Sequence, residues 1–208
     1  MNVDQALETR RSIKHFDPSV TIDDDMLRQL IRPVLYTPTS FNLQHWRFVL
    51  VRDQARKYEL CKAAYNQTQV RDASLVALIV GKLDAHVDAA RVWKGAPDRV
   101  QTSMQRAIDS LYAGDAGLQR DEAVRSGAMA SMALMLRATE LGFSTCPLIG
   151  FDDAEVRRVL GIPADYVTAL LICVGRATAH PHARIGRFAL DEVARLEHFD
   201  GLPLADQP

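Results

Sequence analysis

The apolar residues of the chain fall into helical stripes and short continuous runs. One stripe recurs at the spacing of a single helix face and consists of Leu27, Leu30, Ile31, Val34 and Leu35. Residues 21–23 before it offer a helix cap and acidic side chains that suit the positive end of a helix dipole. Pro33 lies within the stripe, so we expect the helix to kink or end there.

Three continuous apolar runs, at 48–51, 75–80 and 167–174, are predicted strands. Residues 53–64 between the first two have a helical pattern, and strand, helix and strand in this order suggest a crossover unit. Further helices are expected at 2–9, 121–141 and 152–160. Strands scattered among helices favour an α/β or α+β sandwich.

The remaining segments contribute less to the expected core. Residues 85–118 are helical in pattern but charged, as in a surface excursion. The helix at 121–141 is rich in small residues, which indicate either tight core packing or a subunit interface, and Gly142 should end it. The tail, 176–208, has little apolar periodicity and is expected to wrap over another surface.

Length and charge exclude several classes of protein. With 208 residues the chain fits one domain, and its formal net charge of −1 gives no global attraction to nucleic acid or to an anionic membrane. No apolar run spans a bilayer and the first residues lack the core of a signal peptide, so we expect a cytoplasmic protein. Cys61, Cys146 and Cys173 match neither a disulfide framework nor a zinc pattern, and Cys146 lies beside Pro147 in a predicted loop.

No catalytic motif with a side-chain nucleophile or a metal is present. The six histidines lack metal-ligand spacing with carboxylates, so a bound cofactor that carries the chemistry is the economical explanation. A local anion site is offered by Arg10, Arg11, Ser12 and Lys14, because guanidinium groups and a hydroxyl bind phosphate. Taken alone, this cluster is better explained as a solvated helix end, since cations also suit a helix C-terminus.

Four segments in order change that balance: ETRRSIKHFDP (8–18), TPTSFNLQHWRFVLV (37–51), NQTQVRDASLVALIV (66–80) and GFSTCPLIGFDDAEVRRVLGIP (142–163). Together they resemble segments of the FMN-dependent nitroreductase family over nearly the whole chain. The resemblance implies an α+β nitroreductase-like sandwich, in which helices flank a mostly antiparallel central sheet. It also implies an intertwined homodimer built from a single domain, 1–208, with residues 90–120 as a helical excursion near the substrate mouth.

The resemblance assigns residues to the FMN phosphate and to the flavin ring. Arg10 and Ser12 match phosphate-binding residues with Arg11 nearby, and Arg187, with Arg184 as a second candidate, matches basic residues that complete that site. Lys14 matches a cation that stabilises negative charge on the reduced ring. The ring itself is assigned Asn66, with Gln67 or Gln69 as substitutes, and the segment Leu148, Ile149 and Gly150. Many relatives have Glu where Ile149 stands, which puts any hydrogen bond of that carboxylate in doubt.

Residues of the loop after the first stripe are expected to serve the second subunit. Pro38, Thr39, Ser40 and Asn42 match a loop that reaches across a dimer interface to the partner's FMN. Candidates to line the substrate mouth are Phe41, Trp93 and Tyr112, although a lone aromatic residue is more often ordinary packing.

The implied activity is ping-pong transfer of hydride from NADPH or NADH, through FMN, to a nitroaromatic or quinone-like small molecule. Two alternatives stay open on the same scaffold. One is reduction of an activated alkene or of free flavin, and the other is a protein that binds FMN without turnover.

Overall fold

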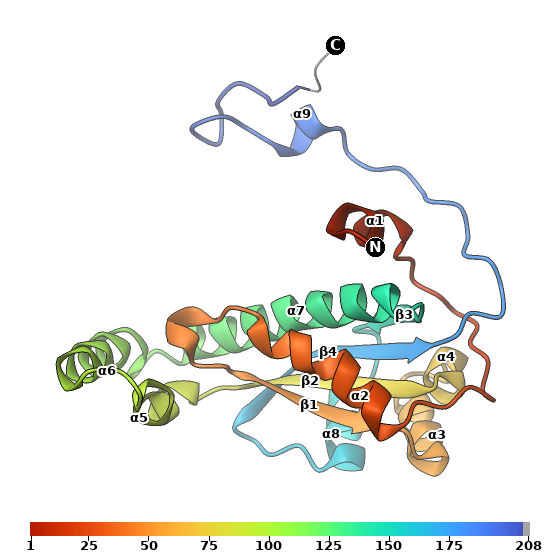
Figure 1. Cartoon of the computed structure of the whole chain (residues 1–208), viewed down its shortest axis with the longest axis horizontal. Helices are drawn as coiled ribbons and strands as arrows, with labels where there is room; N and C mark the ends of the chain where they lie inside the picture. Colours follow the sequence, from red (N-terminus) through yellow and green to blue (C-terminus); the bar gives the residue numbers. More distant parts are fainter. Residues whose placement is uncertain (206–208) are drawn as a thin grey trace.

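The computed structural model describes residues 1–205 and has at its centre an antiparallel sheet of four strands in the order β1-β2-β4-β3 (Figure 1). The strands are β1 (Trp46–Val51), β2 (Leu75–Lys82), β3 (Ser144–Leu148) and β4 (Tyr166–Gly175). The predicted antiparallel sheet flanked by helices is therefore confirmed. The last three residues of the expected domain, 206–208, lie outside the described part of the chain.

The crossover between the first two strands was a wrong prediction. β1 pairs with β2 in antiparallel register, with Val51 opposite Val76. The intervening helices α3 (Gln54–Ala63) and α4 (Thr68–Asp72) are separated by a sharp turn at Tyr65 and Asn66, where φ is 54° and 59°. This turn reverses the chain, so the helical segment begins and ends at the same end of the sheet instead of crossing it.

Strand β3 was also missed, because Cys146 and Pro147 were expected to lie in a loop. Pro147 cannot donate to a strand ladder, and proline is tolerated mainly on edge strands. β3 is such an edge strand of the sheet and lies beside β4, with Cys146 opposite Cys173. All three cysteines are buried free thiols, so Cys146 packs in the core.

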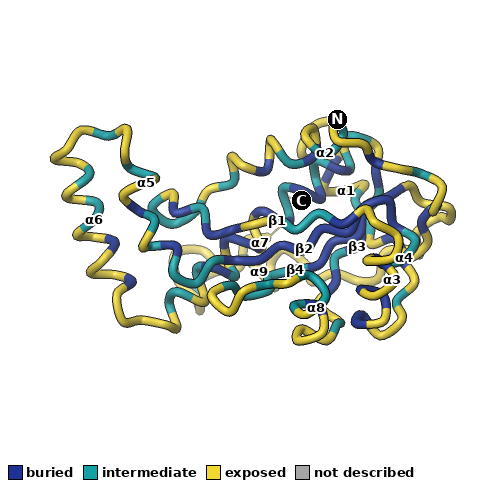
Figure 2. Tube along the Cα trace, turned by 90° about the horizontal axis from the view of Figure 1, so that it is seen from below, coloured by how far each residue is buried: buried dark blue, intermediate teal, exposed yellow. Residues whose placement is uncertain are grey.

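Helices cover both faces of the sheet because β2 is apolar on both faces. Val76, Leu78 and Val80 pack with α3, α4 and α8 (Asp153–Leu160) in one core cluster. The alternate residues Leu75, Ala77 and Ile79 pack with α2 (Asp24–Ile31) and the long α7 (Ala116–Glu140) in a second cluster. Figure 2 shows this centre of the sheet as the most buried part of the chain.

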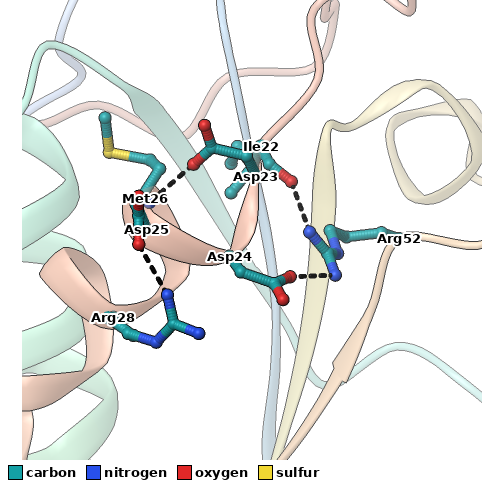
Figure 3. A network of polar contacts seen from close by, with 7 residues as sticks. All are labelled: Ile22, Asp23, Asp24, Asp25, Met26, Arg28 and Arg52. Atoms are coloured by element: carbon teal, nitrogen blue, oxygen red, sulfur yellow. Dashed lines mark hydrogen bonds and ion pairs between the residues drawn. The ribbon is translucent and has the colours of Figure 1, made fainter.

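The start of α2 is fixed by its acidic residues. The Asp23 carboxylate caps the helix by accepting from the Met26 amide at 2.7 Å. Arg52, just after β1, contacts the Asp24 carboxylate at 2.6 Å and the Ile22 carbonyl at 2.9 Å (Figure 3). As expected from Pro33, the α-helix ends at Ile31 and continues as the 3-10 turn η1 (Arg32–Tyr36).

Two parts of the chain extend away from the sheet. The 3-10 turn η3 (Ala85–Asp88), α5 (Ala89–Trp93) and α6 (Asp98–Tyr112) project beyond one end of it, and we call them the helical excursion (Figure 1). After β4 the chain runs outward with only one short helix, α9 (Leu190–Val193), and is almost wholly exposed. Within residues 1–205, no helix has both the length and the apolar character needed to cross a membrane.

Candidate functional site

The basic N-terminal cluster is held beside β3. Helix α1 (Val3–Thr9) ends at Arg10, and the chain continues in extended form. The Ile13 amide donates to the Thr145 carbonyl at 3.0 Å, and Ser12 forms a parallel bridge with Thr145. Ile13 is buried, whereas Ser12 and Lys14 on either side of it are exposed. The alternation of an extended chain therefore leaves the two polar side chains accessible.

The start of the tail passes over this cluster. Arg184 donates to the carbonyl of Arg10 at 3.2 Å and also to that of Glu8, while Arg11 donates to the carbonyl of His182. These contacts bring Arg184 and Arg187 beside residues 10–12, around a cleft of about 410 Å³ whose lining contains no acidic side chain. The resemblance had assigned these arginines and Ser12 to one phosphate site, and the structure brings them together.

The electrostatics of this cleft favour an anion. Burial and the neighbouring charges of Arg187, Arg11 and Arg10 lower the pKa of Arg184. The Nε and Nη1 atoms of Arg10 are buried and have no hydrogen-bond partner in the described structure. Buried donors are nearly always paired, and an unpaired charged donor is costly. An anionic group with several acceptor oxygens, such as a phosphate monoester, would supply the missing partners.

Two further segments assigned to the flavin ring are tied together. The side-chain amide of Gln67 donates to the backbone carbonyl of Gly150 at 2.7 Å. The side-chain amide of Gln69 donates to the side-chain oxygen of Gln67 at 2.9 Å. Asn66 is exposed in the turn beside them. Gln67 and Gln69 thus connect the loops, and Asn66 is the amide presented outward.

The segment after β3 combines a buried and an exposed residue. Leu148 is buried in the core, so its side chain faces away from any cofactor at this loop. Ile149 is 79 % exposed and Gly150 is also exposed. The backbone of this segment and the Ile149 side chain are the groups available to a flat ligand.

Left-handed backbone marks two of the three loops that the resemblance assigned to FMN. Phe41, Asn42 and Gln44 have φ between 50° and 56°, and Tyr65 and Asn66 have similar values. Only Glu197 shares this conformation among the other non-glycine residues described. Such backbone is strained for residues with a Cβ atom and gathers at functional sites.

One chain does not bring all the assigned residues together. The loop with Pro38, Thr39, Ser40 and Asn42 leads into Trp46, which pairs with Gly81 at one end of the sheet. The basic cluster lies beside Thr145 in β3, on the opposite edge and toward the other end (Figure 1). The loop is therefore remote from the arginine-lined cleft of its own chain.

Of the aromatic residues suggested for the substrate mouth, Tyr112 is buried, whereas Phe41 and Trp93 are half-buried beside it. Tyr112 is 1 % exposed and meets Phe41 edge to face, with ring centroids 6.4 Å apart. The Trp93 indole donates to the Phe41 carbonyl at 3.2 Å. Tyr112 is thus a core residue of the excursion and lines no opening.

Sequence reasoning did not single out Thr145 or His45. Thr145 anchors Ser12 and Ile13, and its buried hydroxyl has no partner in the described residues. His45 is buried with its Nδ1 atom 3.1 Å from the Ser126 hydroxyl. Neither had a local signal, although His45 follows directly on the polar loop. Residues 1–205 contain no group of three potential metal ligands.

Comparison with known proteins identifies the family. The sequence profile of the nitroreductase family matches residues 7–176. The chain belongs to the nitroreductase family. Protein DrgA from Synechocystis is 40 % identical over 179 residues, which cover 86 % of this chain and 85 % of DrgA. An NADH dehydrogenase from Thermus thermophilus is 32 % identical over 175 residues, which cover 80 % of this chain and 82 % of that one.

A solved structure from Exiguobacterium sibiricum, described as a complex with FMN, has the same fold. Its TM-score is 0.86 at 26 % sequence identity, and the match covers 93 % of this chain and 96 % of that one. The arginine cleft and its unpartnered Arg10 nitrogens fit the phosphate of such a cofactor.

Proposed function

We propose that this nitroreductase-family protein is an FMN-dependent oxidoreductase that uses NADPH or NADH to reduce a nitroaromatic or quinone-like small molecule. The observation that carries the proposal is the arginine-lined cleft, together with two buried nitrogens of Arg10, one of its lining residues, that lack acceptors in the described structure. Bound FMN would supply the redox chemistry by accepting a hydride from the nicotinamide and delivering electrons to the acceptor.

The phosphate end of the cofactor is assigned to the cleft. Arg10 and Ser12 bind the phosphate, Arg187 and Arg184 complete the site from the tail, and Arg11 adds positive charge while it holds the tail at His182. Planar guanidinium groups suit this task because they offer paired donors to phosphate oxygens.

The ring end is assigned to the loops at Asn66 and at 148–150. Lys14 supplies a cation where negative charge develops on reduction, which stabilises the reduced state. Asn66 binds the polar edge of the ring, and the backbone of Leu148, Ile149 and Gly150 lies against its face. The exposed Ile149 side chain gives the acceptor an apolar contact.

The proposed site needs a second copy of the chain. Pro38, Thr39, Ser40 and Asn42 lie remote from their own phosphate cleft, so we assign them to the FMN of the partner in a homodimer. The tail supports this arrangement, because Ile185, Phe188 and Phe199 are 90 %, 78 % and 97 % exposed. Burying such side chains against another subunit is favourable. We further propose that the whole chain is one domain and acts in the cytoplasm, where its three free thiols stay reduced.

The test is steady-state turnover of the purified protein with each nicotinamide and four acceptors: a nitroaromatic, a quinone, an enone and free FMN. We expect nitroaromatic or quinone reduction to dominate. Faster turnover of the enone or of free FMN would assign the alternative reaction on the same scaffold. Anaerobic mixing with NADPH and with NADH should bleach the flavin. A yellow protein that stays oxidised with both would contradict the proposed oxidoreductase activity.

A further inference from the structure

The loop over residues 39–44 has a backbone that its own residue types disfavour. Phe41, Asn42 and Gln44 have φ values of 51°, 56° and 50°. Asparagine tolerates this left-handed region, but the Cβ atoms of phenylalanine and glutamine clash with the backbone there. None of the three is glycine, so contacts from elsewhere must stabilise the conformation.

Bonds within the loop define the turn but come from the loop itself. The Asn42 amide donates to the Thr39 carbonyl at 2.9 Å and the Leu43 amide to the Ser40 carbonyl at 3.0 Å. The Gln44 amide donates to the Thr39 hydroxyl at 2.9 Å. Leu43 is buried, but the bonds of Asn42 and Gln44 join exposed or half-buried residues, where water could replace them.

Contacts from the helical excursion hold the loop from outside. The Trp93 indole N–H of α5 donates to the carbonyl of Phe41, one of the three left-handed residues of the loop. Tyr112 at the end of α6 packs edge to face against the Phe41 ring. Leu43 is buried in the same cluster, 3 % exposed. The loop is thus fixed at its backbone and at two side chains by helices that follow it by about fifty to seventy residues in the sequence.

We propose that Trp93 and Tyr112 are positioning residues that hold loop 39–44 in its left-handed conformation, and with it Ser40 and Asn42. This inference rests on the proposed function, which assigns those two side chains to the partner's FMN. The helical excursion is then a brace for the cofactor site. A displacement of α5 or α6 would weaken FMN binding in the other subunit.

The test is Trp93→Phe, which keeps a ring but removes the N–H donor. Its control is Tyr112→Phe in the same cluster, which keeps the ring and removes only a hydroxyl that has no partner in the described residues. Amide hydrogen exchange across 39–44 is measured in full-length apoprotein, and FMN affinity by quenching of flavin fluorescence. Loss of one hydrogen bond should speed exchange and weaken FMN binding by roughly five- to tenfold. The control should stay within about twofold of wild type in both measurements.

Tyr112 separates packing from hydrogen bonding. Its hydroxyl has no partner, so Tyr112→Phe should preserve both loop protection and FMN affinity, whereas Tyr112→Leu should lower both. Unchanged amide exchange of loop 39–44 in Trp93→Phe would overturn the proposal that Trp93 holds this loop in place. Faster exchange without weaker FMN binding would overturn its link to the cofactor. Failure of the wild-type protein to bind FMN would instead refute the proposed function, and loop exchange would still report on the brace.

Discussion

Acidification should destabilise the protein through His45, a buried imidazole between the polar loop and the excursion. His45 is 1 % exposed and lies beside Ser126 and Tyr112. Burial lowers the pKa of His45 from 6.5 to about 4, and the nearby His86 and Arg47 add to this effect. The folded protein therefore resists protonation at a pH where the unfolded chain accepts it.

The sign and size of the effect follow from these two pKa values. His45 lowers stability only below pH 6.5, because the unfolded chain then gains a proton that the folded chain does not bind. The loss grows as the pH falls and levels off near the folded pKa of about 4. Between pH 7.5 and 5 it amounts to about 2 kcal/mol of the free energy of unfolding.

Urea unfolding at fixed protein concentration checks this value for wild type and for His45→Asn, whose amide does not titrate. The variant should lose about 2 kcal/mol less than wild type between pH 7.5 and 5, whatever its stability at pH 7.5. His180→Asn removes an exposed histidine and should keep the wild-type pH dependence. Parallel losses in wild type and His45→Asn, within about 0.5 kcal/mol, would refute the argument.

Other predictions concern packing and the proposed cofactor. A Cβ atom at Gly127 in α7 would lie 2.5 Å from the Ala169 Cβ in β4, so Gly127→Ala should cost about 1–3 kcal/mol in urea unfolding. Gly95→Ala meets nothing within 4 Å and should be nearly neutral, and equal effects would contradict the close packing. Arg10→Ala should weaken FMN binding by about 1.5–3 kcal/mol in a fluorescence titration. Lys14→Ala should keep most of that affinity but lower the flavin reduction potential, and equal loss of binding in both would refute their division of roles.

The helices and strands that could be predicted from the sequence are those with a clear local pattern of apolar residues. Strands β1, β2 and β4 each contain a continuous apolar run, and Pro33 correctly limited α2. β3 was missed because Ser144, Thr145 and Pro147 give it no such run, although Thr145 and Cys146 are buried. The antiparallel pairing of β1 and β2 depends on a left-handed turn made without glycine, at Tyr65 and Asn66, which has no local signal.

The candidate site also has one part that could be predicted from the sequence and one part that could not. The basic cluster is contiguous in the sequence, and the ordered motifs assign it to a cofactor. The contacts that complete the site join distant segments: Gln67 reaches Gly150 across 83 positions, and Trp93 reaches Phe41 across 52. One sequence shows no such pairing, because each partner alone is an ordinary polar or aromatic residue.

The absorption spectrum of the purified protein, before and after FMN is added and excess removed, tests the central claim most directly. Binding through the arginine cleft predicts the bands of oxidised flavin, with one FMN retained per chain and most of it lost in Arg10→Ala. A colourless wild-type protein that takes up no added FMN would contradict the account.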